Sequence, residues 1–168
     1  MIEDIIAQSH VLIDSMTFEV GSIALSALRS INESHSQAGP FSKILGIQFE
    51  EMADGRCKAA LEVKQHLLNP LGIAHGGVAF SLADSTSGGA ALSALGEPRI
   101  VTQDMQIRYH APVRPGWLVA EAEILHKGQR TISTLCKVSQ EGVLAASVTA
   151  TFAILSEEEL SMVRNESG

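Results

Sequence analysis

The feature that most constrains the fold is a helix-length run from Gly76 to Gly96, made almost entirely of Gly, Ala, Ser, Leu, Val and Phe. Its one charged residue is Asp84. A surface helix carries several charges on its outer face, so a run this apolar must be covered by protein. A carboxylate inside such a run loses much of its hydration and tends to be kept for chemistry or for a fixed partner. Asp84 is therefore the first candidate for a functional residue.

Length and charge exclude several classes of protein. The 168 residues suit a single domain with a substantial core. The net charge is -7 and no basic stretch interleaves with aromatic residues, so no nucleic-acid partner is expected. No apolar run reaches the roughly 18 residues of a membrane span, and the acidic start lacks the bases of a secretory signal, so we expect a cytoplasmic protein. The two cysteines, Cys57 and Cys136, fit no metal-ligand or redox spacing and are predicted to be core residues.

The chain divides into three parts by pattern. Residues 1–38 are predicted to form a helical extension that ends before Gly39 and Pro40. The extension either packs on the domain or a neighbouring subunit, or recognises a partner. Residues 39–156 form the main domain, and residues 157–168 an acidic C-terminal tail.

The main domain alternates as strands do on both sides of the central helix. From Ile44 the apolar period is two, and the turn at Asp54 and Gly55 predicts a hairpin. Four further strands follow the helix with turns between them, which predicts a meander. The order hairpin, helix, antiparallel strands indicates an α+β domain with one helix against a curved sheet. The residues expected on the inner face of the four later strands are Met105, Ile107, Tyr109; Leu118, Ala120, Ala122, Ile124; Ile132, Thr134, Cys136, Val138; and Leu144, Ala146, Val148, Ala150, Phe152, Ile154.

The stretch from Asn69 to Gly77, which contains His75 and Gly76, and the Asp84 that follows it resemble the signature of hotdog acyl-CoA thioesterases of the phenylacetate-pathway (PaaI-like) type. The resemblance extends from about residue 40 to residue 154. It implies the hotdog fold, an antiparallel sheet wrapped around one central helix. It also implies hydrolysis of an acyl-CoA thioester to free acid and CoA, without metal or bound cofactor, because coenzyme A is part of the substrate. Where the family commonly has an active-site serine, this chain has Thr102.

The spacing of the motif gives a prediction of its own. The first N–H groups of a helix have no partner within it and carry the positive end of its dipole, and Gly76 and Gly77 would let a thioester oxygen approach them closely. Asp84 lies eight residues on, about 12 Å along the same helix at 1.5 Å per residue. It cannot act on a carbonyl held at its own Gly76. Both groups can act on one substrate only if they come from two antiparallel helices, which predicts a homodimer with two equivalent sites. Hotdog dimers often pair further into tetramers.

Each motif residue has an expected role. Asp84 acts as nucleophile or as general base, and Asn69 of the other subunit positions the water or the carboxylate. Thr102 hydrogen-bonds to Asp84 or to the water. His75 orders the loop through backbone groups or helps to place the thioester. Arg130, in a turn, is on the family pattern the best placed of four basic residues for the phosphates of CoA; the others are Arg108, Arg114 and Lys127.

Other interpretations remain open at this stage. His75 and Asp84 together could imitate the His and carboxylate of hotdog dehydratases, and binding without turnover would make the protein an acyl-CoA sensor. Nearby serines could cap Asp84, which would then only fix dimer register. The acyl group is expected to meet Phe80 and Leu82. The pair Gly88 and Gly89 is interpreted as tight packing without a chemical role.

Overall fold

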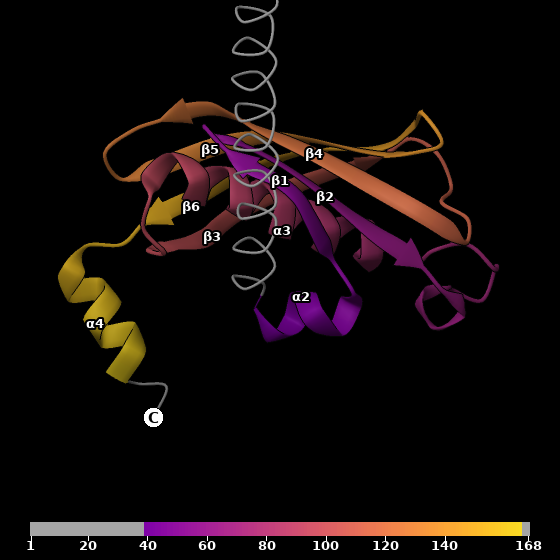
Figure 1. The fold of residues 1–168 in the computed structure, drawn as a ribbon, viewed down its shortest axis with the longest axis horizontal. Coiled ribbons are helices and arrows are strands. Elements are labelled where there is room, and N and C mark those ends of the chain that lie inside the picture. Colours follow the sequence, from indigo (N-terminus) through magenta and orange to yellow (C-terminus); the bar gives the residue numbers. More distant parts are fainter. Residues whose placement is uncertain (1–38, 166–168) are drawn as a thin grey trace, which may run out of the picture.

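The computed structural model describes residues 39–165, in which one antiparallel sheet curves around one long helix (Figure 1). The predicted extension over residues 1–38 lies outside the described residues. Two short helices flank this unit, α2 before the first strand and α4 after the last. In chain order the elements are α2 (Pro40–Leu45), β1 (Gln48–Ala53), β2 (Arg56–Val63), the 3-10 turn η1 (Gln65–Leu67), α3 (Gly76–Leu95), β3 (Ile100–Tyr109), β4 (Gly116–Lys127), β5 (Thr131–Gln140), β6 (Val143–Ile154) and α4 (Glu157–Asn165).

The strand order β1-β2-β4-β5-β6-β3 confirms one part of the predicted meander and corrects another. Strands β4, β5 and β6 are consecutive neighbours, as expected. Strand β3 does not lie beside β4; it pairs with β6 at the far edge of the sheet. The connection from β3 to β4 therefore crosses the end of the sheet. Two backbone hydrogen bonds of 2.8 Å hold it there, from His110 N to the Ala145 carbonyl and from Ala74 N to the Val113 carbonyl. Alternation identifies the buried face of a strand but not its neighbours.

The predicted hairpin between β1 and β2 is confirmed. Its turn residues Asp54 and Gly55 have φ values of 50° and 76°, as the favoured two-residue turns require. The strand period does not begin at Ile44, however, because residues 40–45 form α2. Pro40 is in the first turn of this helix and Gly46, at φ 74°, ends it.

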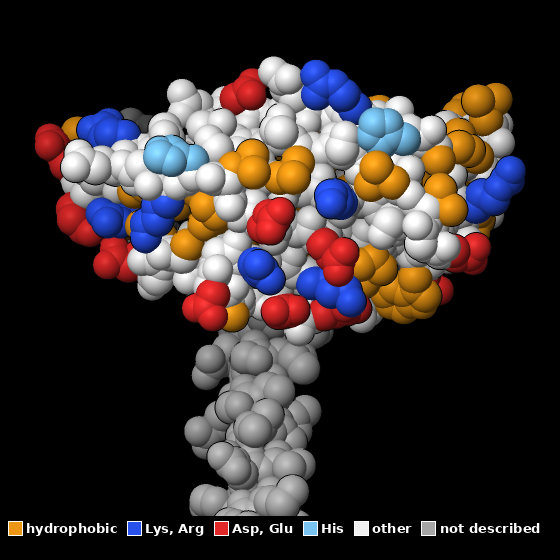
Figure 2. Space-filling view, turned by 90° about the horizontal axis from the view of Figure 1, so that it is seen from above, with side chains coloured by type: hydrophobic (Ala, Val, Ile, Leu, Met, Phe, Trp, Pro, Cys, Tyr) orange, Lys and Arg blue, Asp and Glu red, His pale blue; other side chains and the backbone are white. Residues whose placement is uncertain are grey.

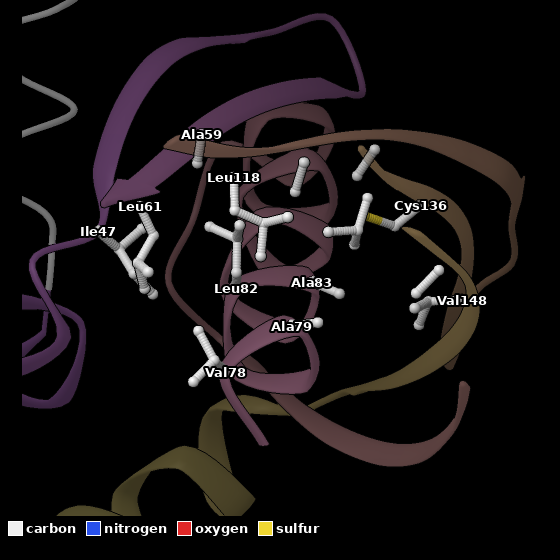
Figure 3. Packing of buried hydrophobic residues seen from close by; sticks show 14 of the residues in the cluster. Ile47, Ala59, Leu61, Val78, Ala79, Leu82, Ala83, Leu118, Cys136 and Val148 are labelled. Atoms are coloured by element: carbon white, nitrogen blue, oxygen red, sulfur yellow. The ribbon is translucent and has the colours of Figure 1, made fainter. Parts of the chain in front are cut away.

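Helix α3 packs into the hollow of the sheet along one broad face made mostly of small side chains, which lets the backbones approach closely (Figure 3). Gly89 shows how close the approach is, since a Cβ there would lie 2.6 Å from Cys57 Sγ. Cys57 and Cys136 are buried, as predicted, and burial raises the pKa of each thiol to about 12. The core residues labelled in Figure 3 are Ile47, Ala59, Leu61, Val78, Ala79, Leu82, Ala83, Leu118, Cys136 and Val148.

Part of the expected acidic tail is the helix α4. It begins with a capping box, in which Glu159 N donates to Ser156 Oγ at 3.2 Å and Ser156 N donates to Glu159 Oε2 at 2.7 Å. These bonds from Ser156, helped by nearby Arg130, lower the pKa of Glu159.

The face of the molecule drawn in Figure 2 carries Lys and Arg side chains interspersed with Asp and Glu, and no large area of one sign. Among the helices of residues 39–165, none is both long and apolar enough to cross a membrane.

Candidate active site

Asp84 lies in the middle of α3 and receives a hydrogen bond from the edge strand. Thr102 Oγ1 donates to Asp84 Oδ1 at 3.0 Å. The nearby Ser85 hydroxyl pairs instead with Ser42 Oγ at 3.3 Å. Asp84 is half-buried in the single chain. The sequence led us to expect that protein covers this residue, and a single copy of the chain covers it only in part. The carboxylate is oriented by β3 and still open on one side.

A cavity of about 240 Å³ adjoins this pair. It runs along the C-terminal half of α3 between the helix, the β1 strand and the start of β3. Apart from Asp84 and Thr102 its lining is mostly apolar, comprising Gly39, Ser42, Phe49, Met52, Ser85, Gly88, Gly89, Leu92, Ile100 and Phe152.

The other motif residues meet at the N-terminus of α3, around a separate cavity of about 380 Å³. Asn69 Oδ1 accepts a hydrogen bond from Leu71 N at 2.9 Å, and Asn69 N donates to the Ile73 carbonyl at 2.8 Å. These bonds close the loop that leads into the helix. The cavity is lined by Asn69, Ile73, Ala74, His75, Gly76, Ala79, Tyr109, His110, Ala111, Pro112 and Val113.

His75 is the N-cap of α3, a position where Ser, Thr, Asp or Asn is more usual. Its Nδ1 accepts a hydrogen bond from Gly77 N at 3.0 Å, so the proton of the neutral ring is on Nε2. A Cβ at Gly77 would lie only 3.0 Å from His75 Nδ1, which explains the glycine. The Gly77 N–H is therefore engaged with His75, and Val78 N donates to the His75 carbonyl.

The N–H of Gly76, which is the first of the helix, takes part in neither of these two bonds. Its carbonyl oxygen accepts a hydrogen bond from Tyr109 Oη at 2.9 Å, and a Cβ at Gly76 would lie 3.1 Å from that oxygen. Sequence reasoning missed Tyr109 as a site residue. Alternation placed it on the core face of β3, but at the end of this edge strand it is 54% exposed and reaches the helix start. Desolvation raises the pKa of this phenol.

Two further residues singled out in the sequence lie outside both cavities. Arg130 is 77% exposed and its Nη2 lies 3.2 Å from Glu159 Oε1 at the start of α4, outside the lining of both cavities. Leu82 is fully buried between α3 and the sheet and lines neither cavity. Phe80, two residues earlier, lies on a different side of the helix and is 38% exposed.

Every fourth residue of α3 forms one ridge that passes both cavities: Gly76, Phe80, Asp84, Gly88 and Leu92. Gly76 belongs to the cavity at the helix start, and Asp84 belongs to the cavity beyond the middle. The structure brings Asn69, His75 and Gly76 together, and Asp84 together with Thr102. It does not bring the two groups together within one chain.

Comparison with known proteins places this geometry in a family. The sequence profile described as the Thioesterase superfamily matches residues 71–146. Conserved protein PA5202 of Pseudomonas aeruginosa is 34% identical, with 72% of this chain and 98% of that chain covered and a TM-score of 0.70. A mutant of the phenylacetic acid degradation protein PaaI from Thermus thermophilus is 30% identical, with 70% and 100% covered and a TM-score of 0.66. The 1,4-dihydroxy-2-naphthoyl-CoA hydrolase of Escherichia coli K12 is 30% identical over 135 residues, 79% of this chain and 96% of that protein.

The chain belongs to the thioesterase superfamily and has the hotdog fold of that family. The resemblance to the PaaI-like thioesterases and the expected fold class are both confirmed.

Proposed function

We propose that this protein hydrolyses an acyl-CoA thioester to a free acid and CoA, at two sites that are each shared between two copies of the chain. The observation that carries the proposal is the separation along one helix of two half-sites, Asp84 with Thr102 and Gly76 with its neighbours. Names of relatives support the substrate class, since one is a 1,4-dihydroxy-2-naphthoyl-CoA hydrolase and another an acyl-coenzyme A thioesterase.

The edge strand β3 supports the shared site. It is ten residues long, has a neighbour only on its β6 side within the described sheet, and touches both half-sites. Thr102 near its start binds Asp84, and Tyr109 at its end binds Gly76. A second copy pairing antiparallel along this edge, about a twofold axis beside the middle of the strand, would set each Thr102 across from the partner copy's Tyr109.

The same axis suits the helix. Phe80 lies midway between Gly76 and Asp84, so a twofold axis beside Phe80 would bring each Asp84 toward the first turn of the other helix. An exposed phenylalanine at this point would be covered in such a dimer. A dimer is the smallest assembly that completes a site, and pairing of dimers into tetramers is compatible with it.

In the proposed reaction the thioester oxygen lies at the Gly76 N–H, at the positive end of the α3 dipole. His75 lines the same cavity as Gly76, and its Nε2–H is proposed as a second donor. As the carbonyl carbon is attacked, its oxygen gains negative charge, so these donors stabilise the transition state more than the substrate.

Asp84 then has two possible chemical roles. As general base it takes a proton from water, whose oxygen bonds to the carbonyl carbon; the C–S bond breaks and the CoA thiolate takes up the proton. As nucleophile it forms a mixed anhydride with release of the thiolate, and water hydrolyses the anhydride. In both routes Thr102 orients the carboxylate, and Asn69 of the partner subunit positions the water or the carboxylate. Neither route requires a cofactor beyond the CoA of the substrate.

Arg130 is proposed to contact the CoA phosphates, for which it would have to leave Glu159. The proposed location is the cytoplasm, where the free thiols of Cys57 and Cys136 would stay reduced.

The test is thiol release from a panel of aromatic, short-chain and long-chain acyl-CoA thioesters by the full chain. Asp84→Ala is expected to lower kcat at least a hundredfold, about 2.7 kcal/mol of transition-state stabilisation, while it keeps the same assembly by sedimentation. No turnover of any thioester by the parent protein would reject the hydrolase. Binding without turnover would then favour the acyl-CoA sensor, and loss of water from a hydroxyacyl thioester with no thiol released would favour the dehydratase.

The shared site has its own test in subunit mixing. Asp84→Ala and Asn69→Ala proteins are unfolded and refolded together, and separately as controls. If Asp84 and Asn69 of one site come from different chains, each mixed dimer regains one intact site. The mixture should then recover about a quarter of the parent activity, because half of the random dimers are mixed and each has one site of two. No recovery, with mixed dimers verified by a tag on one variant, would place the site within one chain.

A further inference from the structure

Gly88 and Gly89 are adjacent in α3, yet the structure separates their roles. A Cβ at Gly89 would collide with Cys57 Sγ at 2.6 Å, so packing against β2 requires that glycine. A Cβ at Gly88 would meet only Phe152 Cε1, at 3.8 Å, which is an ordinary contact. Glycine weakens the interior of a helix. Packing therefore explains Gly89 and leaves Gly88 without an explanation.

The missing side chain of Gly88 opens the cavity beside the reactive carboxylate. Gly88 lies one turn beyond Asp84 on the same ridge of α3, and both line the cavity of about 240 Å³. Phe49, Ile100 and Phe152 supply apolar walls around it. Any larger side chain at position 88 would extend from the ridge into this space.

The cavity is elongated along the helix. Its lining includes Asp84, Gly88 and Leu92, which span eight residues, about 12 Å at 1.5 Å per residue. An extended chain of single bonds advances about 1.2 Å per bond, as the polypeptide backbone does, so this length holds about ten bonds. Met52 and Leu92 line the end of this cavity away from Asp84. Both also line a third cavity, of about 530 Å³, with Ser93, Gly96, Glu97 and Pro98.

We propose that this cavity is the acyl-binding channel, that it takes straight-chain acyl groups of medium length, and that Gly88 admits them while Met52 and Leu92 set their maximum length. The inference rests on the proposed function, because it assumes that the acyl carbonyl is held beside Asp84. It assigns Gly88 a role in specificity and leaves the chemical step to the residues already named.

The first test is the dependence of kcat/KM on chain length, measured with acetyl-, butyryl-, hexanoyl-, octanoyl-, decanoyl-, dodecanoyl- and palmitoyl-CoA, and with phenylacetyl-CoA. Burial of each added methylene is expected to raise kcat/KM about fourfold until the channel is full, near octanoyl or decanoyl. Longer chains are expected to bring no further gain. A profile that is flat, or that favours phenylacetyl-CoA over every straight chain, would overturn the proposed substrate class.

The second test narrows the channel. Gly88→Leu is expected to lower kcat/KM for octanoyl-CoA at least thirtyfold more than it lowers kcat/KM for acetyl-CoA. Ala94→Leu is the control: it adds the same side chain to the same helix, outside the lining of the channel and of the cavity of about 530 Å³. It should keep the chain-length dependence of the parent. If Gly88→Leu does not fold, Gly88→Ala, whose Cβ has room, must show a smaller loss confined to the longer chains. An equal loss on all chain lengths, or none, would overturn the role of Gly88.

The third test removes the end wall. Leu92→Ala would join the proposed acyl channel to the cavity of about 530 Å³, so the preferred acyl chain should lengthen by several carbons. An unchanged chain-length preference would contradict the role of Leu92 in setting the maximum length.

A binding measurement separates this inference from the proposed hydrolysis. Two proteins are compared by isothermal titration, Asp84→Asn and the double variant Asp84→Asn/Gly88→Leu, each with CoA and with octanoyl-CoA. The Asp84→Asn change prevents turnover, so the titration measures the affinity for the acyl chain alone. Octanoyl-CoA should bind the Gly88-containing protein at least tenfold more tightly than CoA does, and Gly88→Leu should abolish that difference. If no thioester is hydrolysed but this difference is found, the channel stands and the hydrolase fails. If thioesters are hydrolysed and no difference is found, the channel fails alone.

Discussion

Thr102 Oγ1 on the edge strand lies 3.0 Å from Asp84 Oδ1 on the central helix and donates a hydrogen bond to it. The bond joins two residues eighteen positions apart in the chain. It fixes the rotation of a carboxylate whose other side faces a cavity. Orientation of this kind is what a general base or nucleophile requires.

The first prediction concerns this hydroxyl. Thr102→Val keeps the shape of the side chain but removes the donor, and a hydrogen bond to a charged group contributes about 1.5–3 kcal/mol. We expect kcat to fall roughly tenfold to a hundredfold, as measured by thiol release. Thr102→Ser retains the donor and should stay within threefold of the parent. A Thr102→Val protein as active as its parent would mean that the bond is not used in the reaction.

The second prediction concerns Tyr109, which holds the first turn of α3 through the Gly76 carbonyl. Tyr109→Phe removes only the hydroxyl, at a cost of about 1 kcal/mol if the bond fixes the helix start. We expect kcat to fall about fivefold with little change in KM. Trp117→Phe alters another exposed aromatic, on β4, and should have no effect. A purely structural role would instead lower the melting temperature and leave kcat unchanged.

The third prediction contrasts the two helix glycines by thermal or urea unfolding. Gly89→Ala places a methyl 2.6 Å from Cys57 Sγ, and overpacking of this kind costs about 1–3 kcal/mol. Gly88→Ala should be neutral or add up to about 1 kcal/mol through helix propensity. Cys57→Ala removes the colliding sulfur, so the double variant with Gly89→Ala should recover part of the loss. Equal effects of Gly88→Ala and Gly89→Ala would contradict the separate roles.

The fourth prediction concerns the two thiols. Burial raises the pKa of Cys57 and Cys136 to about 12, so at pH 8 both are almost entirely in the unreactive thiol form. Neither should react with an aromatic disulfide reagent within minutes in the folded protein, and both should react in denaturant. This matters for thiol-release assays, because the protein would then give little background. Rapid labelling of the native protein would show that one of the thiols becomes exposed.

The fifth prediction concerns the start of α4. The hydrogen bonds from Ser156 lower the pKa of Glu159, so this carboxylate stabilises α4 at pH values above its unfolded pKa. The contribution is lost as pH falls through the lowered folded pKa. The protection factors of the Ser156 and Glu159 amides should therefore fall relative to those of the β4 core as the solution is acidified. In Glu159→Ala the Ser156 amide should have a low protection factor at all pH values, and a pH-independent protection factor in the parent would contradict the capping role.

The elements that the sequence predicted best are those with one fully buried face. Along β5 the alternate residues from Ile132 to Val138 are all buried, as expected, because the inner face of the sheet meets α3. Alternation failed at the start of β6, where Ala145 is buried and Leu144 is exposed. The pairing of β5 with β6 shifts between Val138 and Ser139, and such an irregularity is not visible in the period of one strand.

Long-range placement was harder to predict than local pattern. Nothing in the alternation of β3 shows that it pairs with β6 at an edge, and so nothing points to Tyr109 beside Gly76. Helix α4 has a local signal in the sequence, since Ser156 followed three residues later by Glu159 is a capping box. The clustering of the motif at the helix start needed no long-range information, because residues 69–77 are contiguous.

The proposed sharing of the site between two copies also affects when the protein can act. Under that proposal a newly synthesised chain has one half of each of two reaction centres and no complete one, so it would not hydrolyse thioesters before it meets a second copy. Below the dissociation constant of the pair, turnover per chain should then fall in proportion to total protein, and total turnover with its square. Cells with few copies would lose this activity earlier than their copy number alone implies.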